Sequence, residues 1–197
     1  MAAAKEFPSK TGLRSLSIYY LIGLLASTGL RIGEALALTC DQVDLKHGLL
    51  TIEGAKNGKS RLVPIHTSTQ QALSRYARVR DEYFCASVSS YFFVSERGNR
   101  LWGPDVRNIF YKLSREVGLR GPDDHAGPSL HDARHYFVVQ TLLRRYRSGE
   151  DIDTFLPILA TYLGHCNLQD TFWYLQACPE LMSAAVEKLD SRWEKNP

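Results

Sequence analysis

One short region of the sequence predicts β-structure clearly, and it limits what the rest of the chain can form. Two β-rich runs, GLLTIEG at 48–54 and SRLVPI at 60–65, are joined by AKNGK, in which Asn57-Gly58 is a strong signal for a β-hairpin. Most of the remaining chain shows helical spacing of its apolar residues, with YFFVS at 91–95 as a further short strand. We therefore expect a mainly α protein of the α+β type with one small antiparallel sheet.

Apolar periodicity and end signals predict the helices. They are expected at residues 13–27, 31–39, 67–84, 103–119, 130–146, 153–163, from 167 through 174, and at 179–193. A Thr or Ser is expected to cap the helix at 67–84, and Ser129 to cap the helix at 130–146 with Asp132 in the capping-box position. Pro157 is tolerable only in the first turn of its helix, which Gly164 ends.

Length, charge and cysteine usage narrow the class of protein. The 197 residues suffice for one good-sized domain or two small ones, and the net charge of +3 permits nucleic acid as a partner without requiring it. No apolar run has the length of a membrane span and no signal peptide opens the chain, so we expect a cytoplasmic protein. The cysteines are scattered without a CxxC pair, which favours reduced thiols over a disulfide framework or a zinc site. They are Cys40, Cys85, Cys166 and Cys178.

Arg31 stands at the start of a helix, where a cation opposes the helix dipole. The same position becomes favourable when an anion docks there, because the helix amides and the guanidinium then point at it together. An ordinary salt bridge, for example to Glu34, is an equally good interpretation of this residue.

His131 and Arg134 repeat this pattern near another helix start. They are spaced i, i+3 on a face that continues through the apolar Val138 and Leu142, so both are expected at the end of a buried stripe. An unpaired buried charge is costly. Either a carboxylate pairs with Arg134 or the site is built for an anion, and the alternative for His131 is a satisfied core histidine.

Other candidates have plain alternatives as well. Lys56, Lys59 and Arg61 on the hairpin form either a solubilising cluster or an edge that contacts phosphates. His165 follows the helix-ending Gly164, as capping or surface residues often do. Tyr174 lies in an aromatic cluster and could be a core residue. Several histidines and cysteines are of the type that binds metal, but they have no recognised ligand spacing. They are His125, His131, His135, His165, Cys166 and Cys178.

Taken together, these motifs resemble the catalytic domain of tyrosine recombinases, the phage integrase family. TGLRIGEALAL matches the family's first arginine box, AKNGKSRLVPI its lysine hairpin, LHDARH its HxxR pair, and YLGHCNLQDTFWY its histidine and tyrosine at the usual separation. The resemblance runs from about Leu13 to the last helix. One departure is YLQ, where a histidine often follows two residues after the family's tyrosine.

The resemblance implies the DNA breaking-rejoining enzyme fold and a chemistry without metal or cofactor. Tyr174 would attack a DNA phosphate and form a 3′-phosphotyrosyl link, with neutralisation of the phosphate oxygens as the main requirement. The implied catalytic residues are Arg31 and Arg134 as phosphate-binding forks, His165 as a further donor, His131 as base, Lys56 as acid and Tyr174 as nucleophile. From charge alone, the residues expected to hold flanking DNA are Lys59, Arg61, Arg107 and Lys112.

The same resemblance implies partners and a domain plan. We expect double-stranded DNA as the substrate, a homotetramer on DNA formed through the C-terminal helix, and accessory DNA-bending proteins as candidate partners, in a bacterial, phage or mobile-element setting. Residues 1–12 are expected to be a flexible leader and 13–197 the catalytic domain, without the family's usual N-terminal clamp domain.

The alternatives are three. One is relaxation of DNA by a type IB topoisomerase, another is a catalytically silent DNA-binding protein of the same fold, and the last is a helical interaction module.

Overall fold

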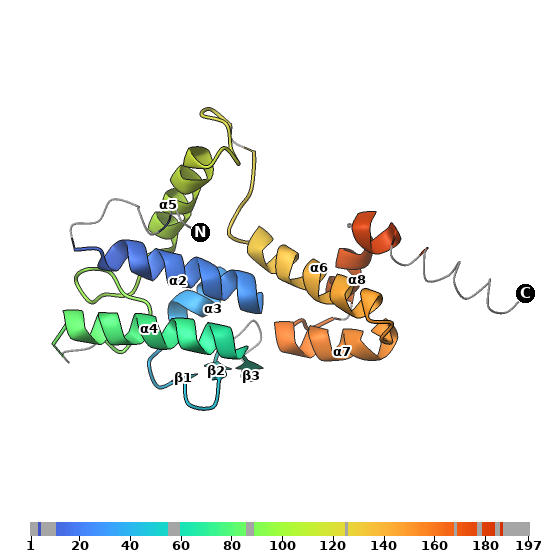
Figure 1. Ribbon diagram of the computed structural model, residues 1–197, viewed down its shortest axis with the longest axis horizontal. Helices are drawn as coiled ribbons and strands as arrows, with labels where there is room; N and C mark the ends of the chain where they lie inside the picture. Colours follow the sequence, from blue (N-terminus) through green and yellow to red (C-terminus); the bar gives the residue numbers. More distant parts are fainter. Residues whose placement is uncertain are drawn as a thin grey trace, which may run out of the picture. The chain divides into compact units, whose positions relative to one another are not determined.

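The computed structural model describes Ala4 and residues 11–54, 60–85, 89–124, 126–167, 169–176, 179–183 and 186. Its elements follow one another along the chain in the order shown in Figure 1. They are α2 (Leu13–Thr28), α3 (Ile32–Ala37), β1 (Val43–Asp44), β2 (Leu49–Ile52), β3 (Arg61–Pro64), α4 (Thr67–Tyr83), α5 (Gly103–Glu116), α6 (Asp132–Arg147), α7 (Ile152–Leu163) and α8 (Gln169–Gln176). The predicted mainly helical fold with a small antiparallel sheet is confirmed.

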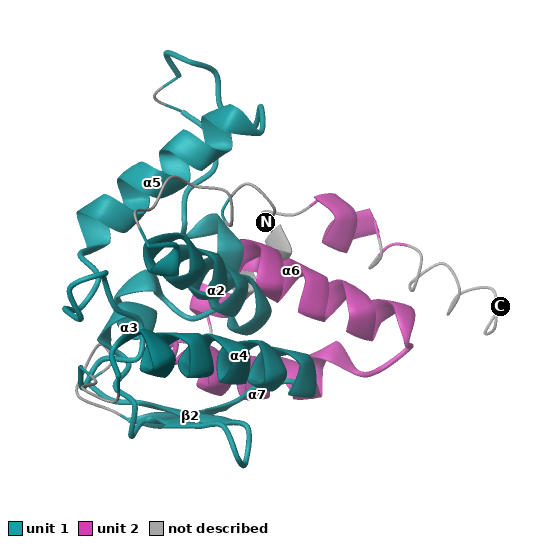
Figure 2. Cartoon of the chain, turned by 60° about the vertical axis from the view of Figure 1, so that its left-hand side comes forward, with its two compact units in different colours: residues 1–134 teal, residues 135–197 magenta. Residues whose placement is uncertain are grey.

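The chain divides into two compact units, residues 1–134 and residues 135–197 (Figure 2). The boundary falls in the first turn of α6.

The first unit is built around α2 and α4, which pack side by side (Figure 1). Tyr76 of α4 is fully buried, and its hydroxyl lies 2.9 Å from the Oγ of Ser17 on α2. The Tyr76 ring stacks on Phe93, with ring centroids 5.2 Å apart. The backbone N–H of Val94 donates to the Tyr76 hydroxyl at 3.3 Å, so this one side chain ties α2, α4 and the 91–94 segment together.

The sheet has the order β1-β2-β3, and both pairs are antiparallel. Leu50 pairs with Val63 and both face the core, whereas the neighbouring Leu62 is 61% exposed. This alternation is the period-two pattern that predicted β2 and β3. The two-residue strand β1 was not predicted, and the hairpin loop with Asn57-Gly58 lies outside the described residues.

Two local predictions in this unit are wrong. YFFVS at 91–95 is not a strand, because it makes only isolated bridges, from Tyr91 to Thr39 and from Val94 to Arg100. The cap of α4 is neither Thr nor Ser. The helix begins at Thr67, so its N-cap is His66. The Nδ1 of His66 accepts from the backbone N–H of Ser68 at 3.2 Å.

The second unit buries one apolar cluster between α6, α7 and α8. Its buried members are Val138, Val139, Leu142, Leu143, Ile152, Leu156, Leu159, Leu163, Tyr174 and Leu181. Gly164 ends α7 in the left-handed conformation, with φ 67°, as predicted. Pro157 lies inside α7, at its sixth residue and not in its first turn, so that prediction is wrong. Residues 179–183, at the predicted last helix, are helical.

Among the helices of the described residues, none is both long and apolar enough to cross a membrane.

Candidate functional site

Arg31 lies where the chain turns from α2 into α3. Gly29 ends α2 with φ 64°, a left-handed conformation that glycine adopts without strain, and the backbone is extended again at Arg31. The backbone N–H of Arg31 donates to the Oε2 of Glu34 at 3.0 Å, and its guanidinium donates to the Oε1 at 3.1 Å. The salt bridge that the sequence left open is therefore present, while 32% of the Arg31 side chain stays exposed.

Glu34 holds a second arginine as well. The two terminal guanidinium nitrogens of Arg61, at the start of β3, donate to the Glu34 carboxylate, at 3.0 and 2.9 Å. Both side chains of this pair are nearly buried. Burial alone would raise the pKa of Glu34, but the hydrogen bonds from Arg61 and Arg31 outweigh it and lower that pKa. Arg61, predicted to contact DNA, thus ties β3 to the start of α3.

Arg134 is 1% exposed, as the buried-stripe interpretation expected. Its Nη1 donates to the carbonyl oxygen of Gly29 at 2.8 Å, across 105 residues of sequence. Since Gly29 precedes Arg31 by two residues, this bond brings Arg134 to the turn that carries Arg31.

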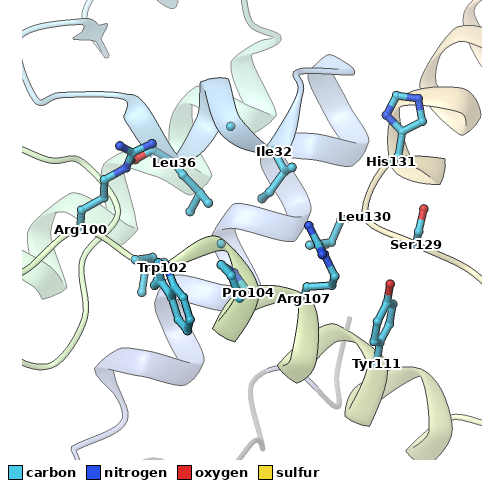
Figure 3. Close-up of a pocket in the computed structure, with 13 residues that line it drawn as sticks. Ile32, Leu36, Arg100, Trp102, Pro104, Arg107, Tyr111, Ser129, Leu130 and His131 are labelled. Atoms are coloured by element: carbon cyan, nitrogen blue, oxygen red, sulfur yellow. Dashed lines mark hydrogen bonds between the residues drawn. The ribbon is translucent and has the colours of Figure 1, made fainter.

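His131 differs from its prediction, because it is exposed and precedes the first residue of α6. The helix start is held by the Asp132 carboxylate, which accepts from the backbone N–H of Ser129 at 2.7 Å, so the side chain of Asp132 plays its predicted capping role. His131 lines a hollow of about 700 Å³ together with Ser129, Arg107 and Tyr111 (Figure 3).

This hollow lies next to the turn that carries Arg31, since the following residue, Ile32, lines it. Ile32, Gly33 and Leu36 of α3 line it, and so do Arg100 and Trp102 ahead of α5 (Figure 3). Arg107 and Lys112 of α5, both predicted DNA contacts, are exposed, but only Arg107 lines the hollow. Lys56 and Lys59 lie outside the described residues.

Tyr174 and His165 meet in the second unit. Their rings stack with centroids 6.2 Å apart and an interplanar angle of 10°. The Nδ1 of His165 lies 2.7 Å from the Oγ1 of Thr171, one turn before Tyr174 on α8. Tyr174 also contacts the ring of His135, at 5.2 Å, and only 5% of its side chain is exposed. By its packing, Tyr174 is therefore a core aromatic residue. One of the two histidines that contact it, His165, is also a candidate site residue from the sequence.

The sequence interpretation missed the roles of Thr171 and His135 in this contact set. Thr171 could have been found from its i, i+3 spacing to Tyr174 on a helix. His135 was considered only as a metal ligand, although it continues the apolar stripe of α6. In the part of the chain that the structure describes, no three His, Cys, Asp or Glu side chains gather as a metal site would need.

The arrangement can do two kinds of chemistry. In the first unit, the exposed part of Arg31, the buried Arg134 and the Arg107 of the hollow provide cationic groups suited to a phosphate, and His131 lines the same hollow. In the second unit, the ring of Tyr174 packs against the rings of His135 and His165.

Comparison with known proteins shows the family to which the chain belongs. The chain is 48% identical over 198 residues to a Sinorhizobium fredii protein named as an integrase/recombinase, y4rB, covering 98% of this chain and 63% of the relative. It is 30% identical to the tyrosine recombinase XerD of Ralstonia nicotianae, covering 91% of this chain and 54% of that protein. The chain thus spans a little over half the length of these relatives.

Solved structures agree on the fold. The crystal structure of XerA recombinase superposes with a TM-score of 0.67 at 24% identity, covering 92% of this chain and 59% of that one. XerH site-specific recombinase, in a post-cleavage complex with palindromic difH, gives 0.70 at 21% identity, covering 98% and 50%. The profile of the phage integrase family matches residues 1–180. The chain belongs to the phage integrase family and has the fold of tyrosine recombinase catalytic domains.

Proposed function

We propose that this chain is the catalytic domain of a site-specific DNA recombinase or integrase, which cleaves and rejoins DNA through a 3′-phosphotyrosyl intermediate at Tyr174. The observation that carries the proposal is the bond from Arg134 to the Gly29 carbonyl, which brings the second arginine of the motif to the turn of the first. Two guanidinium groups at one turn, beside a hollow lined by His131, suit a phosphate. Relatives named as recombinases support the same activity.

The cleavage step assigns each group a role. The Tyr174 hydroxyl loses its proton to His131 and bonds to phosphorus, while the bond from phosphorus to the 5′-oxygen breaks. Lys56 gives the leaving oxygen a proton, which yields a free 5′-hydroxyl. Arg31 and Arg134 neutralise the charge on the non-bridging oxygens, and His165 donates a further hydrogen bond to the phosphate.

The rejoining step reverses the first. A 5′-hydroxyl attacks phosphorus, and the bond to the tyrosine oxygen breaks as the tyrosine regains its proton. The phosphotyrosyl bond conserves the energy of the phosphodiester, so no nucleoside triphosphate is consumed.

DNA and further copies of this chain are the proposed partners. Arg107 and Lys112 on the exposed face of α5, together with Lys59, would hold phosphates beside the cleaved one. Leu181 of the C-terminal segment packs in the core of its own unit, while Met182 and Val186 are more than half exposed. These exposed side chains would meet the neighbouring copy in a tetramer on DNA.

A nicked suicide duplex tests the cleavage directly. DNA flanking the gene is mixed with the protein, and an adduct that survives denaturant is sought on a gel. Tyr174→Phe should abolish the adduct, and Tyr162→Phe, which removes a hydroxyl from the same unit, should retain it.

The outcomes separate the rival activities. Tight DNA binding with no adduct would refute the enzyme and favour a binding protein of this fold. An adduct combined with relaxation of supercoiled plasmid without a defined site would favour a topoisomerase.

A further inference from the structure

His135 occupies a core-facing position on α6 although it is polar. Val138, Val139 and Leu142 lie three, four and seven residues further along the same helix, and all three are buried in the core of the second unit. Residues at these spacings share one helix face. A side chain at this position is therefore expected to make a contact inside its own unit.

That contact is the ring of Tyr174. The two ring centroids are 5.2 Å apart and the planes are tilted by 35°. This separation lies within the range of about 4.5–7 Å at which aromatic pairs attract beyond simple area burial. His135 therefore packs on the tyrosine that the proposed reaction uses, from a helix that does not carry it.

The ring of Tyr174 also packs against a second histidine, His165, which is held by a contact with Thr171. The planes of Tyr174 and His165 are only 10° apart. The Nδ1 of His165 lies 2.7 Å from the Oγ1 of Thr171, which is on the same helix as Tyr174. Thr171 is fully buried. Residues from α6, from the turn after α7 and from α8 thus meet around one ring, and all of them belong to the second unit.

We propose that His135 is a positioning residue that fixes the ring of Tyr174 against His165; its relevance to cleavage rests on the proposed function. The helix α8 has eight residues, and so short a helix is marginal without outside contacts. Covalent catalysis is sensitive to placement, since a displacement of about 1 Å can cost about 100-fold in rate. The ring contact of His135 with Tyr174 supplies the restraint.

Ring placement can be measured in the free protein, without DNA. The ten tyrosines are labelled as 3-fluorotyrosine, and the fluorine resonance of Tyr174 is assigned by its loss in Tyr174→Phe. Ring currents from the two histidines should displace this resonance from those of exposed tyrosines. His135→Ala should move it toward them, and His135→Phe should keep it displaced. Tyr136→Ala removes an exposed ring from the next position of α6 and serves as the matched control.

The functional measurement is single-turnover cleavage of the nicked duplex, with DNA affinity measured in parallel. His135→Ala should slow cleavage about 10–100-fold with unchanged DNA affinity, and His135→Phe should restore most of the rate. Tyr136→Ala should leave the rate unchanged.

Three results would overturn the proposal. The Tyr174 resonance could stay in place in His135→Ala, or the ring could move while cleavage stays fast. Alternatively, His135→Phe could be as slow as His135→Ala, which would assign the imidazole nitrogens a chemical role. Failure of the proposed function itself has a different signature, since the wild type would then form no Tyr174-dependent adduct while the fluorine spectra still decide whether His135 holds the ring.

Discussion

Replacing Glu34 by glutamine removes one negative charge from between two arginines. In the folded protein the carboxylate accepts from the backbone and guanidinium of Arg31 and from both guanidinium nitrogens of Arg61. Glutamine keeps a single carbonyl oxygen, and its amide group presents donors to a guanidinium that can only donate. Glu34→Gln therefore leaves at least one arginine contact unmade and removes the negative charge that both cations share.

The expected cost follows from how buried these groups are. The side chains of Glu34 and Arg61 are 9% and 10% exposed, whereas that of Arg31 is 32% exposed and can be hydrated. Breaking a buried pair by removing one partner costs roughly 3–5 kcal/mol. Because one of the two cations stays partly in water, we expect the low end, about 3 kcal/mol. For a chain of this length that corresponds to a fall in Tm of roughly 6–12 °C.

The same reasoning predicts the pH dependence. The pKa of Glu34 is lowered from its ordinary value of 4.5 in the folded protein, so the unfolded chain binds the proton more tightly. The stability that Glu34 contributes is then fully present above pH 4.5 and is lost as the pH falls through the folded-state pKa. The difference between wild type and Glu34→Gln should be constant near neutral pH and shrink in acid.

Urea unfolding followed by circular dichroism measures both effects. The matched control is Glu82→Gln, which removes the charge of a glutamate that is 70% exposed and 4.0 Å from Arg78. An exposed pair of this kind is worth less than about 1 kcal/mol. A loss of less than about 1 kcal/mol in Glu34→Gln, or a loss that does not shrink in acid, would refute the account of this cluster.

Three further changes test the fold and the DNA surface. Tyr76→Phe should lower the free energy of unfolding by about 1–3 kcal/mol, because Val94 and Ser17 lose a buried partner; a neutral result in urea unfolding would contradict this. Pro157→Ala should raise the free energy of unfolding by about 2 kcal/mol, because it restores a donor inside α7; lower stability in the same assay would show that proline fits there without cost. Arg107→Ala should reduce the slope of log affinity against log salt by about 1, measured by fluorescence anisotropy, and an unchanged slope would exclude a phosphate contact.

Local sequence signals were sufficient for most of the fold. The start of α2 at Leu13 and its end before Gly29 follow from apolar spacing and a left-handed glycine, both of which act within a few residues. The strands β2 and β3 follow from alternation on either side of one turn. The segment at 91–95 was misjudged because its β-branched and aromatic residues pack inside the first unit without a strand partner, a choice that tertiary contacts make.

In the candidate site, too, local features could be predicted from the sequence and contacts between distant residues could not. The buried charge of Arg134 follows from its place on an apolar helix face, but its partner, the carbonyl of Gly29, is 105 residues away in sequence. The salt bridge of Arg31 to Glu34 is local and was one of the two interpretations that the sequence left open, whereas the pairing of Arg61 with the same carboxylate joins a strand to a helix 27 residues earlier. His131 was expected in the buried stripe, but it precedes α6, which begins only at Asp132, and it lines a hollow.

The central claim is that Tyr174 bonds covalently to the 3′ end of a cleaved strand. The adduct formed on a nicked duplex should be digested with nuclease and trypsin, and the nucleotide-bearing peptide sequenced by mass spectrometry. We predict a nucleotide mass on Tyr174, not on Tyr162 of the same tryptic peptide, and a free 5′-hydroxyl on the released strand. Attachment to another residue, or a linkage to the 5′ end, would contradict the account.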